Sequence, residues 1–301
     1  LILPPALRPG ATIGVAAVSG PVEEPALEAG LSHLEKGGYR VREASNLRAR
    51  EGFLAGDDAA RAQGYRELLR DPSVDAIVFA RGGYGAARIL AHLDVEEARR
   101  HPKIHLGGSD LTALFAWLAR AGLTAFYGPM VAVEMARGDA GDWERILSGD
   151  TPAPHRFASE DILSTGLAEG PLVGGCLSLL ASLCGTPDAL TTGGAVLFLE
   201  DIHEEPYRLD RLLTQLERSG TLDGIKGMII GSLLPPPGRD LEAATDAWLA
   251  GRLAGARFPV ARRFPAGHLS SPRTLPLGTT VRLDLTGADP TLNFSGPGVA
   301  A

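Results

Sequence analysis

The chain of 301 residues lacks the marks of several protein classes. It has two cysteines, and its seven histidines are accompanied by no His-Glu-x-x-His pair and no Cys-x-x-Cys, so we expect neither a structural zinc site nor a metal cofactor. No apolar run approaches the roughly 20 residues that cross a bilayer. The first residues, LILPPALRPGATIG, are too short and too broken by proline for a signal peptide.

Basic residues are also scarce. The 29 Lys and Arg are outnumbered by 36 Asp and Glu, which gives a formal charge of -7. Nucleic acids and anionic membranes bind clustered Lys and Arg, so we expect neither as a partner and favour a small-molecule ligand. If the apolar segment around Cys176 and Cys184 is helical, the two residues lie about 12 Å apart along its axis, beyond disulfide reach. Reduced thiols are typical of a cytoplasmic protein.

What is present indicates an α/β protein of two domains. A chain of 301 residues is longer than a single hydrophobic core usually supports, and 45% of its residues are hydrophobic. In the first half, continuous apolar segments such as VDAIVFA and KIHLGG alternate with amphipathic segments such as EEPALEAGLSHLEKGG. Buried strands separated by helices predict a parallel sheet covered on both faces.

The alternation of strand-like and helix-like segments is interrupted around GDWERILSGDTPAPHRFASED, where Gly, Asp, Pro and Ser are frequent. We therefore predict an N-terminal α/β domain over residues 1–155 and a C-terminal domain over residues 156–301. The second half contains the apolar helix segment LSLLASLC, the strand AVLFLE and the helix EPYRLDRLLTQLERSG. It closes with short strands punctuated by proline and glycine, which makes it a mixed α/β unit.

A glycine-rich loop follows the strand VDAIVFA, with Gly82, Gly83 and Gly85. A dinucleotide-binding loop is one interpretation, but the glycine spacing does not fit it and position 88 is Arg. A tight turn before a helix is a second. In a third, the loop amides donate to an oxyanion, and Arg81 binds a carboxylate.

A second such loop carries Ser109, between the strand KIHLGG and the helix LTALFAWLARAG. The serine is either an N-cap, whose oxygen accepts a backbone N–H, or a nucleophile on a sharp strand-to-helix turn. Gly107 and Gly108 allow close approach in the second case, although Leu111 stands where a full Gly-x-Ser-x-Gly motif has its last glycine.

A nucleophilic serine needs a histidine as base and a carboxylate that orients the histidine. Glu200 ends the apolar strand AVLFLE, and Asp201, Glu204 and Glu205 are rivals for the acid. His268 lies in a proline-bounded loop, RFPAGHLSSPRTLPLG. Sequence spacing alone does not join these residues.

Six segments together resemble the LD-carboxypeptidases, also called muramoyltetrapeptide carboxypeptidases, a family of serine peptidases. They are, in the family's order, ARGGYGAARIL, GGSDLTAL, YGPM, GPLVGGCLSLLASLCGTPDAL, LFLEDIHEEPYRLDRLL and FPAGHLSSPRTLPLG. The resemblance spans most of the chain. It implies a flavodoxin-like N-terminal domain with a parallel sheet, a smaller mixed β/β/α C-terminal domain, and a homodimer.

The resemblance also assigns roles. It implies Ser109 as nucleophile, Glu200 as acid and His268 as base, with the backbone amides of Gly83 and Asp110 as the oxyanion hole. Substrate-binding positions are expected at Arg81, Gly82, Tyr84 and Cys176. The implied reaction is hydrolysis of the amide between the L-centre of a diamino acid and a terminal D-Ala in murein tetrapeptide, through an acyl-enzyme and without a cofactor.

An exopeptidase also needs a cation for the terminal carboxylate, for which Arg81 is our first choice and Arg208 and Arg273 are alternatives. Three departures from the family pattern bear on specificity: Gly108 where an aromatic residue is frequent, Cys176 where Asn is frequent, and Arg273 in a loop that usually carries Asn.

Two other functions stay open. The microcin immunity peptidases share the fold and triad but cleave acyl adenylates, and they tend to carry an added loop with a Trp; here Trp117, Trp143 and Trp248 fall in helical segments. A non-catalytic binding protein, in which Ser109 is only a cap, is the third possibility.

Overall fold

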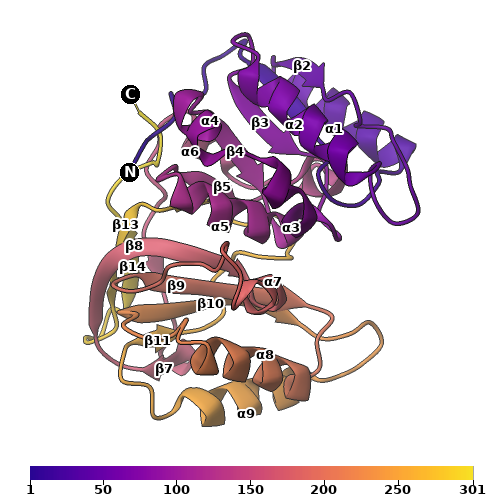
Figure 1. The fold of residues 1–301 in the computed structure, drawn as a ribbon. Coiled ribbons are helices and arrows are strands. Elements are labelled where there is room, and N and C mark those ends of the chain that lie inside the picture. The colour runs from indigo at the N-terminus through magenta and orange to yellow at the C-terminus, as the bar shows by residue number, and fades with distance from the viewer. Residues whose placement is uncertain (301) are drawn as a thin grey trace.

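The computed structural model describes residues 1–300, which form two lobes, each built on its own β-sheet (Figure 1). The first sheet has six strands in the order β12-β5-β4-β3-β1-β2, and the second has eight in the order β6-β14-β13-β8-β9-β10-β11-β7. A parallel-rich sheet followed by a mixed sheet confirms the predicted fold class.

The first lobe alternates strands and helices as expected. Its elements are β1 (Thr12–Ala16), α1 (Glu24–Lys36), β2 (Arg40–Glu43), α2 (Asp58–Arg70), β3 (Ala76–Phe79), α3 (Ala86–Ile89), α4 (Val95–Arg100), β4 (Ile104–Gly107), α5 (Thr112–Arg120), β5 (Ala125–Tyr127) and α6 (Trp143–Leu147). Short 3-10 turns at Leu90–His92 and Ser109–Leu111, and a π-helical turn at Val131–Met135, connect them.

Strands β2, β1, β3, β4 and β5 run parallel, so their carboxyl ends lie along one edge of the sheet. Strands β1, β3, β4 and β5 are buried along their whole length, which explains their continuous apolar sequence. Helix α1, with Leu27, Leu31 and Leu34 inward, covers one face together with α6. Helices α2 and α5 cover the other face.

The second lobe is mixed. Its elements are β6 (His155–Arg156), β7 (Ile162–Ser164), β8 (Leu167–Cys176), α7 (Leu177–Leu183), β9 (Val196–Ile202), α8 (Pro206–Arg218), β10 (Gly227–Leu234), α9 (Glu242–Leu253), β11 (Val260–Ala261), β13 (Thr280–Asp284) and β14 (Thr291–Phe294). Strands β8 to β11 are parallel, whereas β13 pairs with β8 in the antiparallel sense. Helices α7, α8 and α9 pack over β9 and β10 through their leucines.

The two lobes share one continuous core. Residues of α5, such as Leu118, belong to the same buried cluster as Leu172 of β8 and Phe198 of β9. Strand β12 (Leu275–Leu277) comes from the C-terminal part of the chain but pairs antiparallel with β5 in the first sheet. The placement of the domain boundary at residue 155 stays a prediction, because the chain crosses between the sheets again after that point.

The two ends of the described chain lie side by side (Figure 1). Pro5 and Ala300 form an isolated parallel bridge, and the amide of Ala6 donates to the carbonyl of Ala300 at 3.0 Å. Within residues 1–300, no helix is long and apolar enough to cross a membrane, and no group of three His, Cys, Asp or Glu side chains is placed to hold a metal ion.

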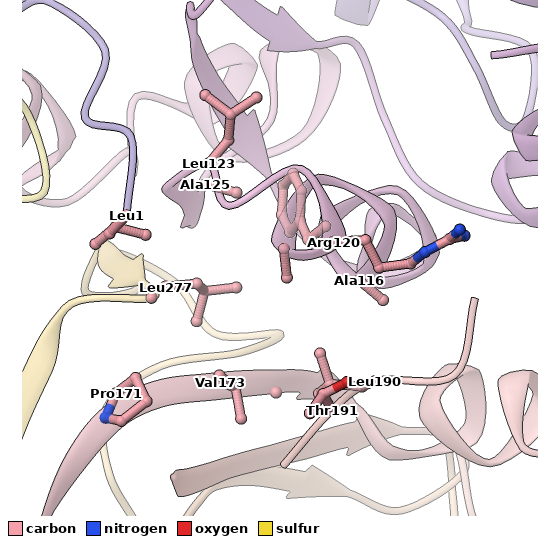
Figure 2. Close-up of a pocket in the computed structure, with 14 residues that line it drawn as sticks. Leu1, Ala116, Arg120, Leu123, Ala125, Pro171, Val173, Leu190, Thr191 and Leu277 are labelled. Atoms are coloured by element: carbon pink, nitrogen blue, oxygen red, sulfur yellow. The ribbon is translucent and has the colours of Figure 1, made fainter. Parts of the chain in front are cut away.

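A cavity of about 220 Å³ lies between α5 and β8 (Figure 2). Its walls are mainly apolar, with Ala116, Leu123, Val173 and Leu277 among them. Arg120 also lines it, but its guanidinium is paired with Asp188. The pocket contains none of the residues predicted to form the functional site.

His105 of β4 is a fully buried histidine, and both of its ring nitrogens are hydrogen-bonded. Its Nδ1 lies 2.9 Å from the carbonyl of Lys103 and its Nε2 lies 2.9 Å from the hydroxyl of Tyr65. Because a carbonyl only accepts, Nδ1 carries the proton and Nε2 accepts from the phenol. Burial lowers the pKa of His105 from 6.5 to about 4.

We therefore predict that His105 makes the fold sensitive to acid. Since the pKa is lower in the folded state than in the unfolded chain, the stabilisation is complete above pH 6.5 and is lost as the pH falls towards 4. The loss amounts to about 3 kcal/mol, at about 1.4 kcal/mol per pKa unit. Glutamine does not titrate in this range. The free energy of unfolding in urea should therefore fall by about 3 kcal/mol less between pH 7 and pH 4 in His105→Gln than in wild type. His92→Gln, at an exposed histidine, is the control. Equal pH dependence in wild type and His105→Gln would refute the assignment.

Candidate active site

The predicted site residues lie where the two sheets meet. Ser109 follows β4, and the loop 80–85 follows β3, at the carboxyl edge of the first sheet. Glu200 lies near the carboxyl end of β9, in the second sheet. Figure 1 shows α3 and α5, which these first-lobe loops precede, facing the second lobe. Open α/β sheets bind ligands at this kind of edge.

Ser109 has a strained backbone and does not occupy a helix-cap position. Its φ is +58°, a left-handed value that is rare for a residue with a side chain. Its backbone N–H donates to the hydroxyl of Tyr127 at 2.8 Å. Neither the 3-10 turn at Ser109 nor α5 has a side-chain cap, and within residues 1–300 the Ser109 hydroxyl has no hydrogen-bond partner. The N-cap interpretation is therefore wrong, and the sharp strand-to-helix turn is the one observed.

The glycine loop after β3 touches the serine. A Cβ at Gly82 would lie 2.8 Å from Cβ and 3.1 Å from Oγ of Ser109, and 3.3 Å from the backbone nitrogen of Asp110. Gly83 has a φ of +113°, which favours glycine. The amides of Gly83 and Asp110 have no hydrogen-bond acceptor in the described part of the chain, so both are available to a ligand.

Asp110 ties these two loops together. Its carboxylate is buried and accepts from the hydroxyl of Ser19 at 2.6 Å and from the amide of Ala86 at 2.8 Å. Burial raises the pKa of Asp110, and these two hydrogen bonds oppose the rise. Because Ala86 begins α3, the carboxylate holds the start of that helix against the serine loop.

Glu200 and His268 form a close pair. Oε2 of Glu200 accepts from Nδ1 of His268 at 2.7 Å and from the backbone N–H of the same residue at 3.1 Å. Since a carboxylate only accepts, Nδ1 carries the proton in the neutral ring, and Nε2 is left with a free lone pair. The Glu200 side chain is fully buried, and that of His268 is 19% exposed.

The pKa of His268 reflects this pairing. Burial alone lowers it, but the hydrogen bond to Glu200 and the charges of Glu200, Asp201 and Glu134 outweigh burial, so the pKa is raised above its ordinary value. Gly267, with a φ of +107°, allows the approach, because a Cβ there would lie 2.6 Å from Oε2 of Glu200.

The rival acids lie elsewhere. Asp201 accepts from the backbone N–H groups of Ser178 and Ile202, each at 2.8 Å. Glu204 lies 3.7 Å from Arg208, and Glu205 lies 3.1 Å from Arg239. Of the four acids considered from sequence, Glu200 is the one that contacts the histidine.

The three candidate cations differ in their surroundings. Arg81 is half-buried, donates to the carbonyl of Pro21 at 3.1 Å, and has no carboxylate within ion-pair distance among residues 1–300. Arg208 pairs with an acid and bonds to the neighbouring phenol. Arg273 lies 5.6 Å over the ring of Phe264 and donates to the carbonyl of Ala153.

The remaining predicted positions lie close to this group without a visible ligand role. Cys176 is buried, and its thiol lies 3.4 Å from a carboxylate oxygen of Asp201. Burial raises the pKa of this thiol well above its ordinary value. Tyr84 is 55% exposed and meets the ring of Phe53 edge to face at 5.6 Å. A role of Cys176 and Tyr84 in binding substrate stays a prediction.

Sequence reasoning missed Tyr127, the last residue of β5. Its hydroxyl accepts from the N–H of Ser109 and donates to Oε1 of Glu200 at 2.6 Å. A signal was available, because β5 lies next to β4 in the sheet and a tyrosine at its carboxyl end falls at the same edge as the serine. No hydrogen bond joins the Ser109 hydroxyl to His268 within residues 1–300.

Two family models match the sequence. The model of the LD-carboxypeptidase N-terminal domain matches residues 13–128, and that of the LD-carboxypeptidase C-terminal domain matches residues 169–283. Together they cover well over half of the chain, in the order and positions of the two lobes.

Individual proteins agree with these models. A Bacillus subtilis protein named probable murein peptide carboxypeptidase is 35% identical over 290 residues, covering 93% of this chain and 91% of the relative. The crystal structure of a muramoyltetrapeptide carboxypeptidase from Oxalobacter formigenes has a TM-score of 0.84 and 30% identity, over 94% of this chain and 98% of the other.

The microcin C7 self-immunity protein of Escherichia coli is 26% identical over 328 residues, covering 92% of each protein. A solved structure of a protein of that name has a TM-score of 0.85 with 23% identity, over 98% of this chain and 99% of the other, and shares the two-lobed fold.

We predict that Glu200→Gln lowers the pKa of His268 below 6.5. The amide removes the negative charge that opposes the effect of burial, whereas Asp201 and Glu134 act only as more distant charges. The measurement is an NMR titration of the His268 Cε1 proton, assigned with His268→Gln. Asp201→Asn, on the same strand, is the matched control and should lower the pKa less. Indistinguishable titrations of wild type and Glu200→Gln would contradict the pairing.

Proposed function

This chain belongs to the LD-carboxypeptidase family, and from that premise we propose that it is a serine carboxypeptidase acting on murein tetrapeptide. The bond cleaved would be the amide between the L-centre of a diamino acid and the terminal D-Ala. The family assigns the chain to the peptidases, and the names of the relatives point to murein peptides. The observation that carries the serine mechanism is the pairing of His268 with Glu200 beside a left-handed Ser109.

The chemistry would follow from the protonation state of the histidine. The neutral ring presents Nε2 as a base, which takes the proton of the Ser109 hydroxyl as the oxygen bonds to the scissile carbonyl carbon. The same nitrogen then gives this proton to the leaving amine of D-Ala, and the C–N bond breaks. Water hydrolyses the resulting ester by the same route. No cofactor enters either step.

The oxyanion of each tetrahedral intermediate would be held by backbone amides. Among residues 1–300 the N–H groups of Gly83 and Asp110 have no acceptor, and they come from two loops that meet at Ser109. Donors fixed before the reaction stabilise the developing charge without reorganisation. The Asp110 carboxylate would maintain this alignment through its bonds to Ser19 and Ala86.

The terminal carboxylate of the substrate needs a cation, and Arg81 is our candidate. Its loop contacts Ser109 through Gly82, and its charge is not matched by a carboxylate within the described residues. Arg208 and Arg273 are already engaged with other groups. An arginine with one backbone contact retains donors for a ligand.

A second candidate is cleavage of acyl adenylates, favoured by the similarity to the microcin C7 self-immunity protein. The tryptophans argue against it. Trp117 and Trp143 are core residues, and Trp248 on α9 donates to Asp210 at 3.0 Å, so none lies in an added loop. The homodimer implied by the family resemblance and the cytoplasmic location inferred from the reduced cysteines stay predictions.

We predict that Ser109→Ala lowers kcat for release of D-Ala from a synthetic murein tetrapeptide by at least about 10³-fold, as loss of a triad member does. A coupled D-amino-acid oxidase assay measures the release, and calorimetry should show that the variant still binds the peptide. Ser182→Ala, on the surface of α7, should match wild type.

The same assays separate the alternatives. Full activity in Ser109→Ala would disprove the nucleophile. Turnover of an aminoacyl adenylate, but not of the tetrapeptide, by wild type would favour the second candidate. Binding of the peptide without turnover would identify a binding protein.

We predict that Arg81→Gln raises KM for the tetrapeptide about 10- to 100-fold, the effect of losing a charge-assisted hydrogen bond. It should also weaken the preference of wild type for the free acid over the C-terminal amide of the same peptide. Arg145→Gln removes an exposed arginine that pairs with Asp150 and should leave both values unchanged. An unaltered acid-to-amide preference in Arg81→Gln would mean that another group binds the carboxylate.

A further inference from the structure

We propose that Tyr127 is a positioning residue whose single hydroxyl aligns the nucleophile and the catalytic acid with each other. The proposal rests on the serine mechanism above, in that it takes Ser109 as the nucleophile and Glu200 as the carboxylate that orients the histidine. It concerns a residue of β5 that carries no charge and touches neither the histidine ring nor the serine hydroxyl by hydrogen bonding.

The directions of the two hydrogen bonds are fixed. The backbone N–H of Ser109 can only donate, so the phenol oxygen accepts it at 2.8 Å. The carboxylate of Glu200 accepts, so the phenol proton lies on its side, at 2.6 Å from Oε1. Burial and the nearby charge of Glu200 raise the pKa of Tyr127 well above its ordinary value, so the hydroxyl keeps its proton.

The ring itself is held in place by its neighbours. Tyr127 is 3% exposed, with Phe198 edge to face at 5.4 Å and Phe115 edge to face at 6.3 Å. Gly108 lies against it, because a Cβ there would be 3.4 Å from Cε1 of the ring. A large side chain at position 108 would compete for this space. The ring therefore brings its hydroxyl to one point with little freedom.

Ser109 depends on this hydroxyl because its backbone is strained. A φ of +58° at a residue with a Cβ persists only when surrounding contacts determine it. The bond to Tyr127 is the contact made by the Ser109 N–H, on the residue whose orientation decides where Oγ points. Without an acceptor, this N–H would be left unpaired beside a buried ring, which is unfavourable.

Glu200 depends on the same hydroxyl because its carboxylate is fully buried. Oε2 receives two N–H donors from His268, and Oε1 receives the phenol proton. A buried carboxylate needs donors on both oxygens to hold one orientation. The phenol thus fixes the plane in which Oε2 faces Nδ1 of the histidine.

The titratable groups around the pair come from both lobes. His268 is faced by Glu200 and Asp201 of β9 and by Glu134 of the π-helical turn. Tyr127 is faced by Glu200 and by the buried thiol of Cys176. If the phenol hydroxyl is removed, the Glu200 carboxylate loses one hydrogen-bond donor and its negative charge interacts more strongly with the protonated His268 ring. The pKa of His268 should therefore rise.

The test compares Tyr127→Phe with Tyr65→Phe. Both variants delete one buried phenol hydroxyl in the first lobe, and the Tyr65 hydroxyl bonds to His105, a residue that the proposed mechanism does not use. Four quantities are measured on the full chain: kcat, KM, the pH profile of kcat/KM, and the NMR titration of His268. Urea unfolding reports the stability of each variant.

For Tyr127→Phe we expect kcat to fall about 10- to 100-fold with KM changed less than about threefold. The acid limb of the profile and the His268 titration should both move to higher pH. Tyr65→Phe should lose stability comparably but keep kcat, the acid limb and the titration of wild type. Normal kcat and an unmoved acid limb in Tyr127→Phe would overturn the proposal, as would equal losses of kcat in both variants.

The NMR titration separates this proposal from the function on which it rests. If wild type fails to cleave the tetrapeptide, the proposed function fails, while a raised His268 pKa in Tyr127→Phe still supports the coupling. An unshifted pKa in that case overturns it.

Discussion

The carboxylate of Glu200 is the constraint on which the site depends. It is fully buried, and a buried charge is tolerated only when its oxygens are hydrogen-bonded. Its donors come from two distant parts of the chain: Tyr127 at the edge of the first sheet, and His268 in the loop after β11. The two lobes must therefore meet in one arrangement for this charge to be satisfied, and that arrangement also places Ser109 against the phenol.

Close backbone approach makes this arrangement possible. Gly82 lies against Ser109, and Gly267 lies against Glu200, in both cases at distances where a Cβ would collide. Gly175 of β8 is similarly close to Thr112, whose hydroxyl accepts from the amide of Cys176 at 3.0 Å. These three glycines are therefore needed where loops and lobes pack closely against each other, and not to make a loop flexible.

Much of the fold followed from the sequence, because burial on both faces of a parallel strand leaves a continuous apolar run that is readable locally. The placement of β12 did not. Strand Leu275–Leu277 is three residues long, contains a proline, and pairs with β5 some 150 positions earlier. The residues around it therefore do not indicate which strand it pairs with. Tyr127 was missed for a related reason: its role lies in two contacts with residues far along the chain.

The sequence by itself determined the alternation of strands and helices and the family to which the chain belongs, because both can be read from adjacent residues or from the order of the motifs. Only the tertiary structure decided which carboxylate faces His268, since Glu200 and Asp201 are neighbours on one strand and point to opposite sides of the sheet. It also decided that the Ser109 side chain caps no helix within residues 1–300 and that the Tyr127 hydroxyl joins Ser109 to Glu200. These outcomes depend on distances between segments that the chain brings together only on folding.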